Sequence, residues 1–237
     1  MIISHTHKFI FIKSFKTAGT SIDTALSNYC SGNDIVTPLN NYRHNRNEKG
    51  EFLHKAMNAD NYIKLNLPNL QHVEVKVIKE METPEVWNNY FKFSIARNPW
   101  DRAISYFYWD NRNNPALKSR KRFYHHLGVP FNEISQLRKL FSEYIKRTKL
   151  PSNDPFYIND DVLCVDSVIR YENLIEDFDN ICTKLGLPKI VLPRLKGGIR
   201  AQGYHYSKYY DEESRKIVAE QHKNDIRLFR YKFEDVL

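Results

Sequence analysis

Short apolar runs alternate with amphipathic segments along this chain. Residues 8–13, residues 90–96 and the stretch 162–174 each contain a compact apolar run of the length typical of a buried strand. Each is followed, after a short loop, by a segment whose apolar residues recur every three or four positions, as on one face of a helix. Because strand–loop–helix units repeat, the sequence predicts an α/β fold of three layers, with a central parallel sheet between helices.

Two of the predicted helices carry recognisable start signals. Thr20 is placed to cap a helix over residues 20–30, and Asp23 follows three positions later as in a capping box. After the second strand, Asn98 is a typical cap residue and Pro99 suits the first position of a helix. Both helices therefore begin at the carboxyl end of a predicted strand, where the ligands of such sheets usually bind.

The other segments divide into further helices and polar stretches. We expect an amphipathic helix over residues 131–147, ended by Pro151, and a terminal helix over residues 211–229. Residues 73–78 fit either a helix or a short strand. Residues 31–60 are polar and indicate an insertion or loop.

The length of 237 residues suits one substantial domain, and the sequence contains no internal repeat or low-complexity tract. We therefore expect a single domain over residues 1–237, with variable insertions around 31–89 and 110–160.

Composition narrows the ligands and the compartment. Lys and Arg total 36 against 28 Asp and Glu, a net charge of +8 that favours anionic ligands such as a nucleotide, a nucleic acid, an acidic glycan or a membrane surface. The basic residues are spread out, which argues against a nucleic-acid partner. No signal peptide or apolar run of about 20 residues occurs, so no transmembrane segment is expected. Three widely spaced cysteines suit a reducing cytoplasm.

The loop after the first strand has the composition of a phosphate-binding turn. Lys16 supplies a point charge, Gly19 permits close approach of the backbone, and the hydroxyls of Thr20 and Ser21 are able to donate hydrogen bonds to oxygens. The start of the following helix points backbone N–H groups toward the same place. A capped turn with a surface lysine would look similar, so this stretch alone favours phosphate binding only modestly.

Two further basic elements strengthen the case. Arg97 follows the second strand, and Ser105 comes about two turns into the next helix, where the two side chains are suited to share a phosphate group. The sequence "PRLKGGIR", residues 193–200, adds a glycine-rich basic loop. Three such elements suit a nucleotide with phosphates at two separate positions, whereas a nucleoside triphosphate needs only one cradle.

At this point the sequence resembles the sulfotransferases that use 3′-phosphoadenosine 5′-phosphosulfate (PAPS). "FIKSFKTAGTS" is similar to their 5′-phosphosulfate loop, and "FSIARNPWDRAISYFY" to their 3′-phosphate motif. "DSVIRYENLIEDFDNIC", "LPRLKGGIR" and "HYSKYYDEESRKIV" are similar to bacterial carbohydrate-type members, which have a fold related to P-loop NTPases. One departure is Lys13-Ser14-Phe15, where many members carry His-hydrophobic-Pro, and it bears on the rigidity of the loop.

The resemblance implies roles for particular residues in binding the donor. Lys16 would stabilise the leaving phosphate, and the backbone N–H groups of Thr17, Ala18, Gly19, Thr20 and Ser21 would hold the 5′-phosphate. Arg97 and Ser105 would hold the 3′-phosphate, and the segment of Lys196, Gly197, Gly198 and Arg200 would close over it. The reaction would be in-line transfer of the sulfonate group, with 3′,5′-adenosine bisphosphate as product and no required metal.

A hydroxyl acceptor also needs a general base, and histidine has a suitable pKa. His54, in "GEFLHKAMNAD", is the first candidate, because this stretch resembles the His-X-X-Ala segment of the family, although its alanine comes one position earlier; Glu48, Glu51 and Asp60 are substitutes. Arg43 and Arg46, in the same insertion, are candidates for gripping an acidic acceptor. A carbohydrate or glycan is the expected acceptor, with a lipid, a phenol or a small metabolite left open.

Two other functions remain open on the sequence alone. A nucleotide-dependent kinase would use Asp166, at the end of the apolar run 162–166, to hold Mg²⁺. Against it, no G-x-x-x-x-G-K-[ST] motif occurs, and Lys16 precedes the glycine instead of following it. A non-catalytic polyanion binder would bind many anions with strong salt dependence. Such a protein has no need to retain Lys16, Arg97 and Ser105 together.

Overall fold

The structure is a computed structural model that describes residues 1–39, 54–67, 69–113, 133–193, 195 and 204–235. The chain forms two compact units. The first consists of Met1–Arg97 and Asn153–Lys196, and the second of Asn98–Ser152 and Gly197–Leu237. Each unit is described by itself below, and the organisation as one domain stays a prediction.

A five-stranded sheet forms the centre of the first unit. Its strands lie in the order β3 (Ile35–Val36), β1 (Ile2–Ser4), β2 (Phe9–Ile12), β4 (Phe91–Ala96) and β7 (Ser167–Arg170). The strands β2, β4 and β7 are parallel, whereas β1 is antiparallel to both β2 and β3. The predicted parallel sheet is therefore confirmed at its core and extended by β1 and β3, two strands that join through antiparallel pairs and that the sequence pattern did not reveal.

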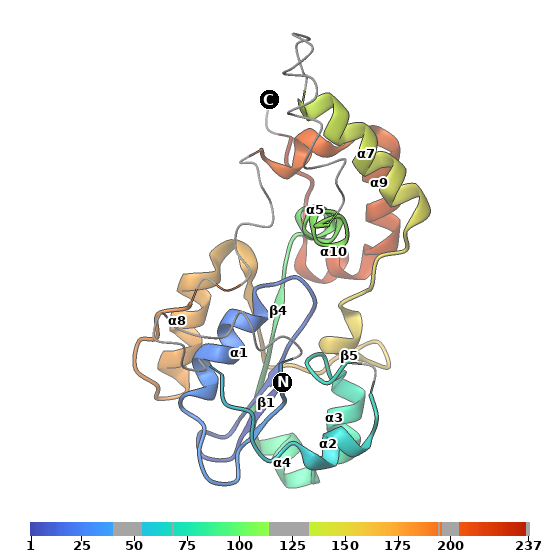
Figure 1. The fold of residues 1–237 in the computed structure, drawn as a ribbon. Helices are drawn as coiled ribbons and strands as arrows, with labels where there is room; N and C mark the ends of the chain where they lie inside the picture. Colours follow the sequence, from blue (N-terminus) through green and yellow to red (C-terminus); the bar gives the residue numbers. More distant parts are fainter. Residues whose placement is uncertain (40–53, 68, 114–132, 194, 196–203, 236–237) are drawn as a thin grey trace. The chain divides into compact units, whose positions relative to one another are not determined.

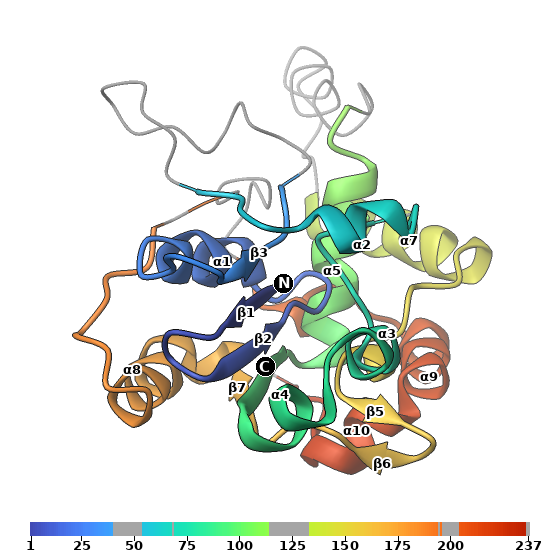
Figure 2. The ribbon, with the colours of Figure 1, turned by 90° about the horizontal axis from the view of Figure 1, so that it is seen from below.

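Helices cover both faces of this sheet. Figures 1 and 2 show α1 (Gly19–Ser27) and α8 (Leu174–Lys184) on one side, with α2 (Asp60–Lys64), α3 (Val75–Met81) and α4 (Pro84–Asn89) on the other. Alternate side chains of the strands pack against the first pair of helices, and the resulting core includes Phe9, Phe11, Phe93, Ile95, Ile22, Leu26, Phe178 and Ile181. This arrangement confirms the predicted three-layer α/β/α fold.

The structure decides two segments of the first unit that the sequence pattern left ambiguous, while the third strand predicted within residues 162–174 is confirmed as β7. Residues 73–78 belong largely to helix α3, because Val75 and Ile78 are spaced to bury one helical face. The run 162–166 is not a strand of the central sheet. Its first residues form β6 (Val162–Leu163), which pairs with β5 (Ile158–Asn159) in an exposed hairpin. The two intervening residues, Asp160 and Asp161, have φ of 50° and 58°, as a tight hairpin turn requires.

The second unit is helical. It contains α5 (Pro99–Asp110), α7 (Glu133–Arg147), the 3₁₀ turn η4 (Tyr206–Tyr209), α9 (Glu212–Gln221) and α10 (Lys223–Phe229). Aromatic rings fill its interior, with Phe107 edge-on to Phe141 and Phe141 edge-on to Tyr210. Asn98 caps α5 by accepting hydrogen bonds from the N–H groups of Trp100 and Asp101, as the sequence predicted.

The predicted terminal helix over residues 211–229 is interrupted at His222. The backbone of this residue leaves the helical region, with φ −127° and ψ 30°, and Nδ1 of its buried imidazole accepts a hydrogen bond at 3.0 Å from Nη2 of Arg102 on α5. Arg102 also forms a buried ion pair at 3.0 Å with Asp225. The predicted helix thus divides into α9 and α10 at His222, where the imidazole is buried against Arg102.

Candidate active site

The loop between β2 and α1, residues 13–18, has an unusual backbone. Lys16 and Ala18 both lie in the left-handed region, with φ of 58° and 63°, although neither is glycine. Such conformations cost about 1 kcal/mol or more each and occur often at ligand-binding loops. Helix α1 starts at Gly19, and no side chain of the described residues caps it, because Ala18 is the N-cap residue. The first N–H groups of a helix have no acceptor within the helix, so this end of α1 suits an anion.

The predicted cap at Thr20 is therefore wrong. Thr20 lies inside the first turn of α1, and the carboxylate of Asp23 contacts Lys13 instead of the helix start. The N–H group of Ser21 donates to the carbonyl of Ala18 at 2.9 Å, which closes the first turn. The N–H group of Ser21 is consequently already used within the helix.

Side chains distant in sequence hold this loop in place. The buried amide of Asn153 accepts from the N–H of Phe15 at 3.0 Å and donates to the carbonyl of Phe15 at 3.1 Å. The hydroxyl of Ser14 donates to the carbonyl of Ile95 on β4 and lies 2.9 Å from the hydroxyl of Thr17. These bonds fix the loop without the proline that many members of the resembled family carry.

Gly19 has a structural role that differs from the one its motif suggested. A Cβ atom at this position would lie 2.7 Å from Cγ of Lys13. Because real Cβ atoms do not approach other atoms so closely, the glycine is needed for the buried stem of Lys13 to pass over the start of α1. Close approach of the backbone to a phosphate is thus not the only reason for a glycine here.

Arg97 lies beside the loop, at the end of β4. Its Nη1 donates a hydrogen bond to the carbonyl of Lys16 at 2.9 Å, and its guanidinium stacks 3.9 Å from the ring centre of Tyr171. Tyr171 follows β7 directly, so three neighbouring parallel strands each contribute a residue at their carboxyl ends. Tyr171 was missed by the sequence analysis, although its place after a strand was a signal that pointed to this edge.

The described residues place the remaining candidates as follows. The N–H of Leu195 donates to the hydroxyl of Ser21 at 3.4 Å, so the chain is next to α1 one residue before Lys196. Ser105 lies half-buried on α5 in the second unit. The other predicted positions fall outside the described residues: Lys196, Gly197, Gly198, Arg200, Arg43 and Arg46.

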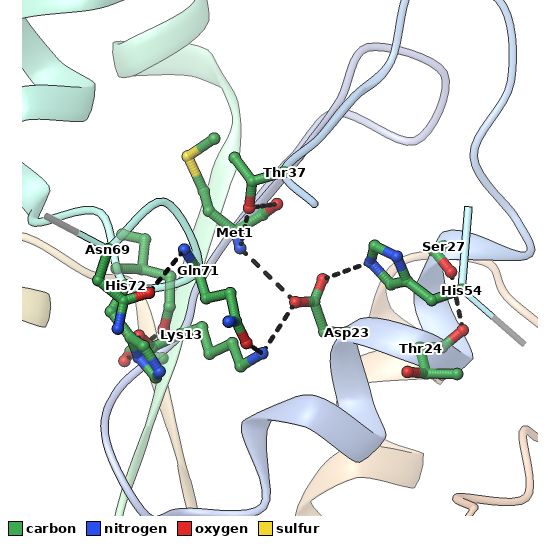
Figure 3. Close-up of polar contacts among 12 residues, drawn as sticks. Met1, Lys13, Asp23, Thr24, Ser27, Thr37, His54, Asn69, Gln71 and His72 are labelled. Atoms are coloured by element: carbon green, nitrogen blue, oxygen red, sulfur yellow. Dashed lines mark hydrogen bonds and ion pairs between the residues drawn. The ribbon is translucent and has the colours of Figure 1, made fainter. Parts of the chain in front are cut away.

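A cluster of buried charged groups surrounds Asp23 of α1, as Figure 3 shows. Asp23 is its centre: Oδ2 lies 3.2 Å from Nζ of Lys13 and 3.7 Å from the N-terminal amino group, and Oδ1 lies 3.7 Å from Nε2 of His54. Lys13 also donates to Oε1 of Gln71 at 3.4 Å. All these charged side chains are almost completely buried. His54 therefore lies against α1 and not in an exposed polar loop.

Burial and charge act in opposite directions within this cluster. Burial alone raises the pKa of Asp23, but the N-terminal amino group, Lys13 and His54 outweigh it and hold that pKa well below its usual range. Burial lowers the pKa of Lys13, with Asp23 partly offsetting the effect. Burial, with Lys13 nearby, also lowers the pKa of His72 to about 3. Asp23 is thus an ionised carboxylate at neutral pH, and neither Asp23 nor Lys13 was identified from the sequence as part of the site.

Asp166 lies elsewhere. It precedes β7, and its Oδ2 accepts from the N–H of Lys92 at 2.7 Å and pairs with Nζ of Lys92 at 3.2 Å. It is therefore at the amino end of its strand, whereas the loop and Arg97 lie at the carboxyl ends. The described residues also bring together no three His, Cys, Asp or Glu side chains that would suit a metal ion.

Comparison with protein-family models matches residues 1–232 to the sulfotransferase family. The chain belongs to the sulfotransferase family. Comparison with curated proteins gave no match, and comparison with solved structures gave none either. The match covers nearly the whole chain, so the sulfotransferase assignment applies to both compact units.

Family membership makes this protein a transferase of sulfonate groups. The loop and Arg97 of the sulfotransferase lie together in the first unit, which is the arrangement expected of a site for a phosphorylated ligand. None of the helices in the described part of the chain has the length and apolar character to cross a bilayer.

Proposed function

We propose that this sulfotransferase transfers the sulfonate group of PAPS to a hydroxyl or amine of a carbohydrate acceptor and releases 3′,5′-adenosine bisphosphate. The observation that supports this most is the hydrogen bond from Arg97 to the carbonyl of Lys16. It joins the two motifs that the sequence associates with the 5′- and 3′-phosphates, at neighbouring parallel strands. A ligand with two separate phosphates needs cationic groups from two such elements.

The start of α1 would hold the 5′-phosphate. The helix start at Gly19 carries the positive end of the helix dipole, and the left-handed residues Lys16 and Ala18 turn the backbone of the preceding loop there. The hydroxyl of Thr17 is engaged with Ser14, so its N–H is the group that remains for the ligand. The strain at this loop is the expense of holding it in a shape ready for binding.

Arg97 would hold the 3′-phosphate, together with Ser105 on α5. A guanidinium carries five N–H donors in a planar fork that matches a phosphate, and stacking on Tyr171 fixes the plane of this one. The segment after Leu195 would complete the nucleotide site through Lys196, Gly197, Gly198 and Arg200. The contact of Leu195 with Ser21 supports this, because it brings the start of that segment to α1.

Lys16 would assist the chemical step. The acceptor oxygen forms a bond to sulfur while the bond from sulfur to the bridging phosphate oxygen breaks, and negative charge develops on that oxygen. A lysine ammonium and a helix start both stabilise such charge without reorganising. The proposal therefore requires no metal ion.

His54 would act as the general base that takes the proton of an acceptor hydroxyl. Arg43 and Arg46 would bind an acidic acceptor. A cytoplasmic location fits the three free cysteines. Burial raises the pKa of Cys30 to about 12 and that of Cys182 to about 11, so these two thiols are unreactive at neutral pH.

A transfer assay with ³⁵S-labelled PAPS tests this proposal. Purified protein is incubated with labelled donor and a panel of glycans, sugars, phenols and small alcohols, with and without a metal chelator. We expect label to appear on at least one carbohydrate, at a rate that the chelator does not change. The proposal fails if no acceptor is labelled and the protein does not bind 3′,5′-adenosine bisphosphate. Labelling of a phenol alone would correct the acceptor class.

A further inference from the structure

Asp23 and His54 face each other in the protein interior at a distance longer than a hydrogen bond. Oδ1 of Asp23 and Nε2 of His54 are 3.7 Å apart, and both are buried. Among the residues that the structure describes, neither atom has a hydrogen-bond partner. Buried polar atoms are nearly always hydrogen-bonded, so an acceptor and a potential donor that face each other in this way call for an explanation.

The two oxygens of the Asp23 carboxylate have different surroundings. Oδ2 faces two amino groups, Nζ of Lys13 at 3.2 Å and the N-terminal amino group at 3.7 Å. Oδ1 is directed at the imidazole alone, as Figure 3 shows. Lys13 is itself held by Gln71 and packs over Gly19, so the carboxylate is fixed at the second turn of α1. The ion pair thus orients one lone pair toward His54.

Hydrogen bonds of the two residues Lys55 and Met57 also fix the segment that follows His54. The N–H of Lys55 donates to Oγ of Ser27 on α1 at 3.4 Å. Two residues further on, Met57 pairs with Val36 of β3 through hydrogen bonds of 2.9 and 3.1 Å. His54 therefore lies against α1 at the start of an anchored segment, so the backbone as well as the side chain holds it beside Asp23.

We propose that Asp23 is the positioning residue of His54: its Oδ1 accepts Nε2–H and thereby makes Nδ1 the nitrogen that takes the proton of the acceptor hydroxyl. This inference rests on the proposed function, in which His54 is the base. Hydrogen bonds of catalytic groups are often long in the free enzyme and tighten when substrates bind, which fits the 3.7 Å separation.

The transfer step balances with this pair in place. The hydroxyl proton moves to Nδ1 of His54, and the electron pair of the oxygen forms the new bond to sulfur. The old bond from sulfur breaks, and its electron pair stays on the 5′-phosphate oxygen near Lys16. The imidazolium that results faces the ionised carboxylate, which stabilises it without itself being protonated. The other titratable groups that face Asp23 are Lys13 and the N-terminal amino group, and His72 lies beside Lys13.

The first test does not need activity. Long-range ¹H–¹⁵N spectra of histidine-labelled protein report which ring nitrogen is protonated, and the His54→Ala variant assigns the signal. At a pH at which the ring is neutral, we expect His54 to be protonated at Nε2, and we expect Asp23→Asn to abolish that preference. A ring protonated at Nδ1 in the wild-type protein would overturn the proposal, whether or not the protein transfers sulfonate.

The second test is a double-mutant cycle of Asp23→Asn and His54→Ala, read as kcat and as affinity for 3′,5′-adenosine bisphosphate. We expect Asp23→Asn to lower kcat about 100-fold with the affinity changed less than about twofold, and to cause no further loss in the His54→Ala background. Equal losses in both backgrounds would show that Asp23 acts only through stability and would overturn the proposal.

Asp34→Asn is the matched control. Asp34 is also fully buried in the first unit, where it binds Ser4, Thr6 and Ser31, so its variant measures the effect of neutralising a buried aspartate. If Asp23→Asn does not fold, the double variant Lys13→Met/Asp23→Asn removes both partners of the ion pair. It then replaces Asp23→Asn in the double-mutant cycle with His54→Ala. Absence of any transfer by the wild type would refute the proposed function, and the spectra would still decide the pairing.

Discussion

Gly19 and Lys13 form one packing unit at the start of α1. The stem of Lys13 passes over the glycine, and its ammonium ends at Asp23, one turn along the same helix. A side chain at position 19 would displace the stem and so disturb the ion pair, although alanine is otherwise the better helix former. Loop, helix start and buried carboxylate are therefore coupled through a single lysine.

Gly19→Ala should for this reason lower the free energy of unfolding by about 1–3 kcal/mol, as overpacking of a buried site does. The measurement is thermal or urea denaturation, repeated in the Lys13→Ala background, where the atom that the new Cβ meets is gone. There we expect Gly19→Ala to be neutral or stabilising. The same loss in both backgrounds would show that contact with Lys13 is not the reason for the glycine.

Lys16→Ala should reduce turnover far more than it weakens binding of 3′,5′-adenosine bisphosphate, because the role proposed for Lys16 is to stabilise the charge that develops as the phosphate leaves. We expect a loss of about 100-fold or more in kcat, by analogy with removal of other groups that stabilise a developing charge. Lys8→Ala, an exposed lysine of the same unit, is the control and should leave both quantities unchanged. Equal losses in kcat and affinity would assign Lys16 to ground-state binding.

At this scale the sequence predicted residues whose type and spacing form a motif, and it missed residues that act through packing. Lys16 and Arg97 were placed at one sheet edge because both follow predicted strands, and their contact agrees with this. Asp23 was interpreted as part of a helix cap, since its partners Lys13 and His54 are brought to it only by the folded chain. No local pattern reveals such a cluster.

The strongest local signals determine single elements. Asn98 followed by Pro99 predicted the start of α5, and the structure has the cap and the helix at those residues. Short apolar runs of strand length likewise predicted β2 and β4. Both strands are buried along most of their length, so most positions in them are apolar. Where burial depends on partners from elsewhere, the pattern is ambiguous: alternation over residues 73–78 fits a strand, but the packing selects helix α3.

Asn98→Ala should destabilise the second unit by about 1–2 kcal/mol, the usual effect of losing an N-cap. Asn98 also donates at 3.3 Å to the hydroxyl of Tyr206 and to the carbonyl of Lys232, so the loss should lie toward the upper end. Thr83→Ala, which removes the exposed cap of α4, is the matched control. A smaller loss for Asn98 than for Thr83, in denaturation experiments, would contradict this account of α5.

For the whole molecule, buried histidines make stability depend on pH. Burial, with Arg102 nearby, lowers the pKa of His222 to about 3, whereas an unfolded histidine titrates near pH 6.5. Between these values the unfolded chain binds a proton that the folded chain does not. Stability should therefore fall as the pH is lowered from about 6.5 toward 3, by up to about 1.4 kcal/mol per pH unit.

His222→Gln should flatten this dependence, because the amide is able to accept from Arg102 and does not titrate. The melting temperature of the second unit, followed by calorimetry from pH 7 to pH 4, is the measurement. Curves of equal steepness for the wild type and His222→Gln would show that another group controls the response to acid.

The division of the chain into two compact units is the feature that the sequence predicts least well. The repeating strand–loop–helix pattern predicted one three-layer domain, and the layers are present in the first unit. The helical second unit arises because α5 and the terminal helices bury aromatic rings against α7. Such packing is set by contacts between segments about 100 residues apart, for example Tyr108 with Tyr209, and these contacts leave no periodic signal in the chain.

The central claim is that the protein binds a nucleotide that carries phosphates at both its 5′ and 3′ positions. Calorimetric titration of wild type and Arg97→Ala with 3′,5′-adenosine bisphosphate, adenosine 5′-phosphate and ATP with Mg²⁺ tests it most directly. The account predicts that the bisphosphate binds wild type tightest, and that Arg97→Ala weakens the bisphosphate about 10-fold or more while hardly changing adenosine 5′-phosphate. Tighter binding of ATP with Mg²⁺, or an equal loss for both adenosine nucleotides in Arg97→Ala, would contradict it.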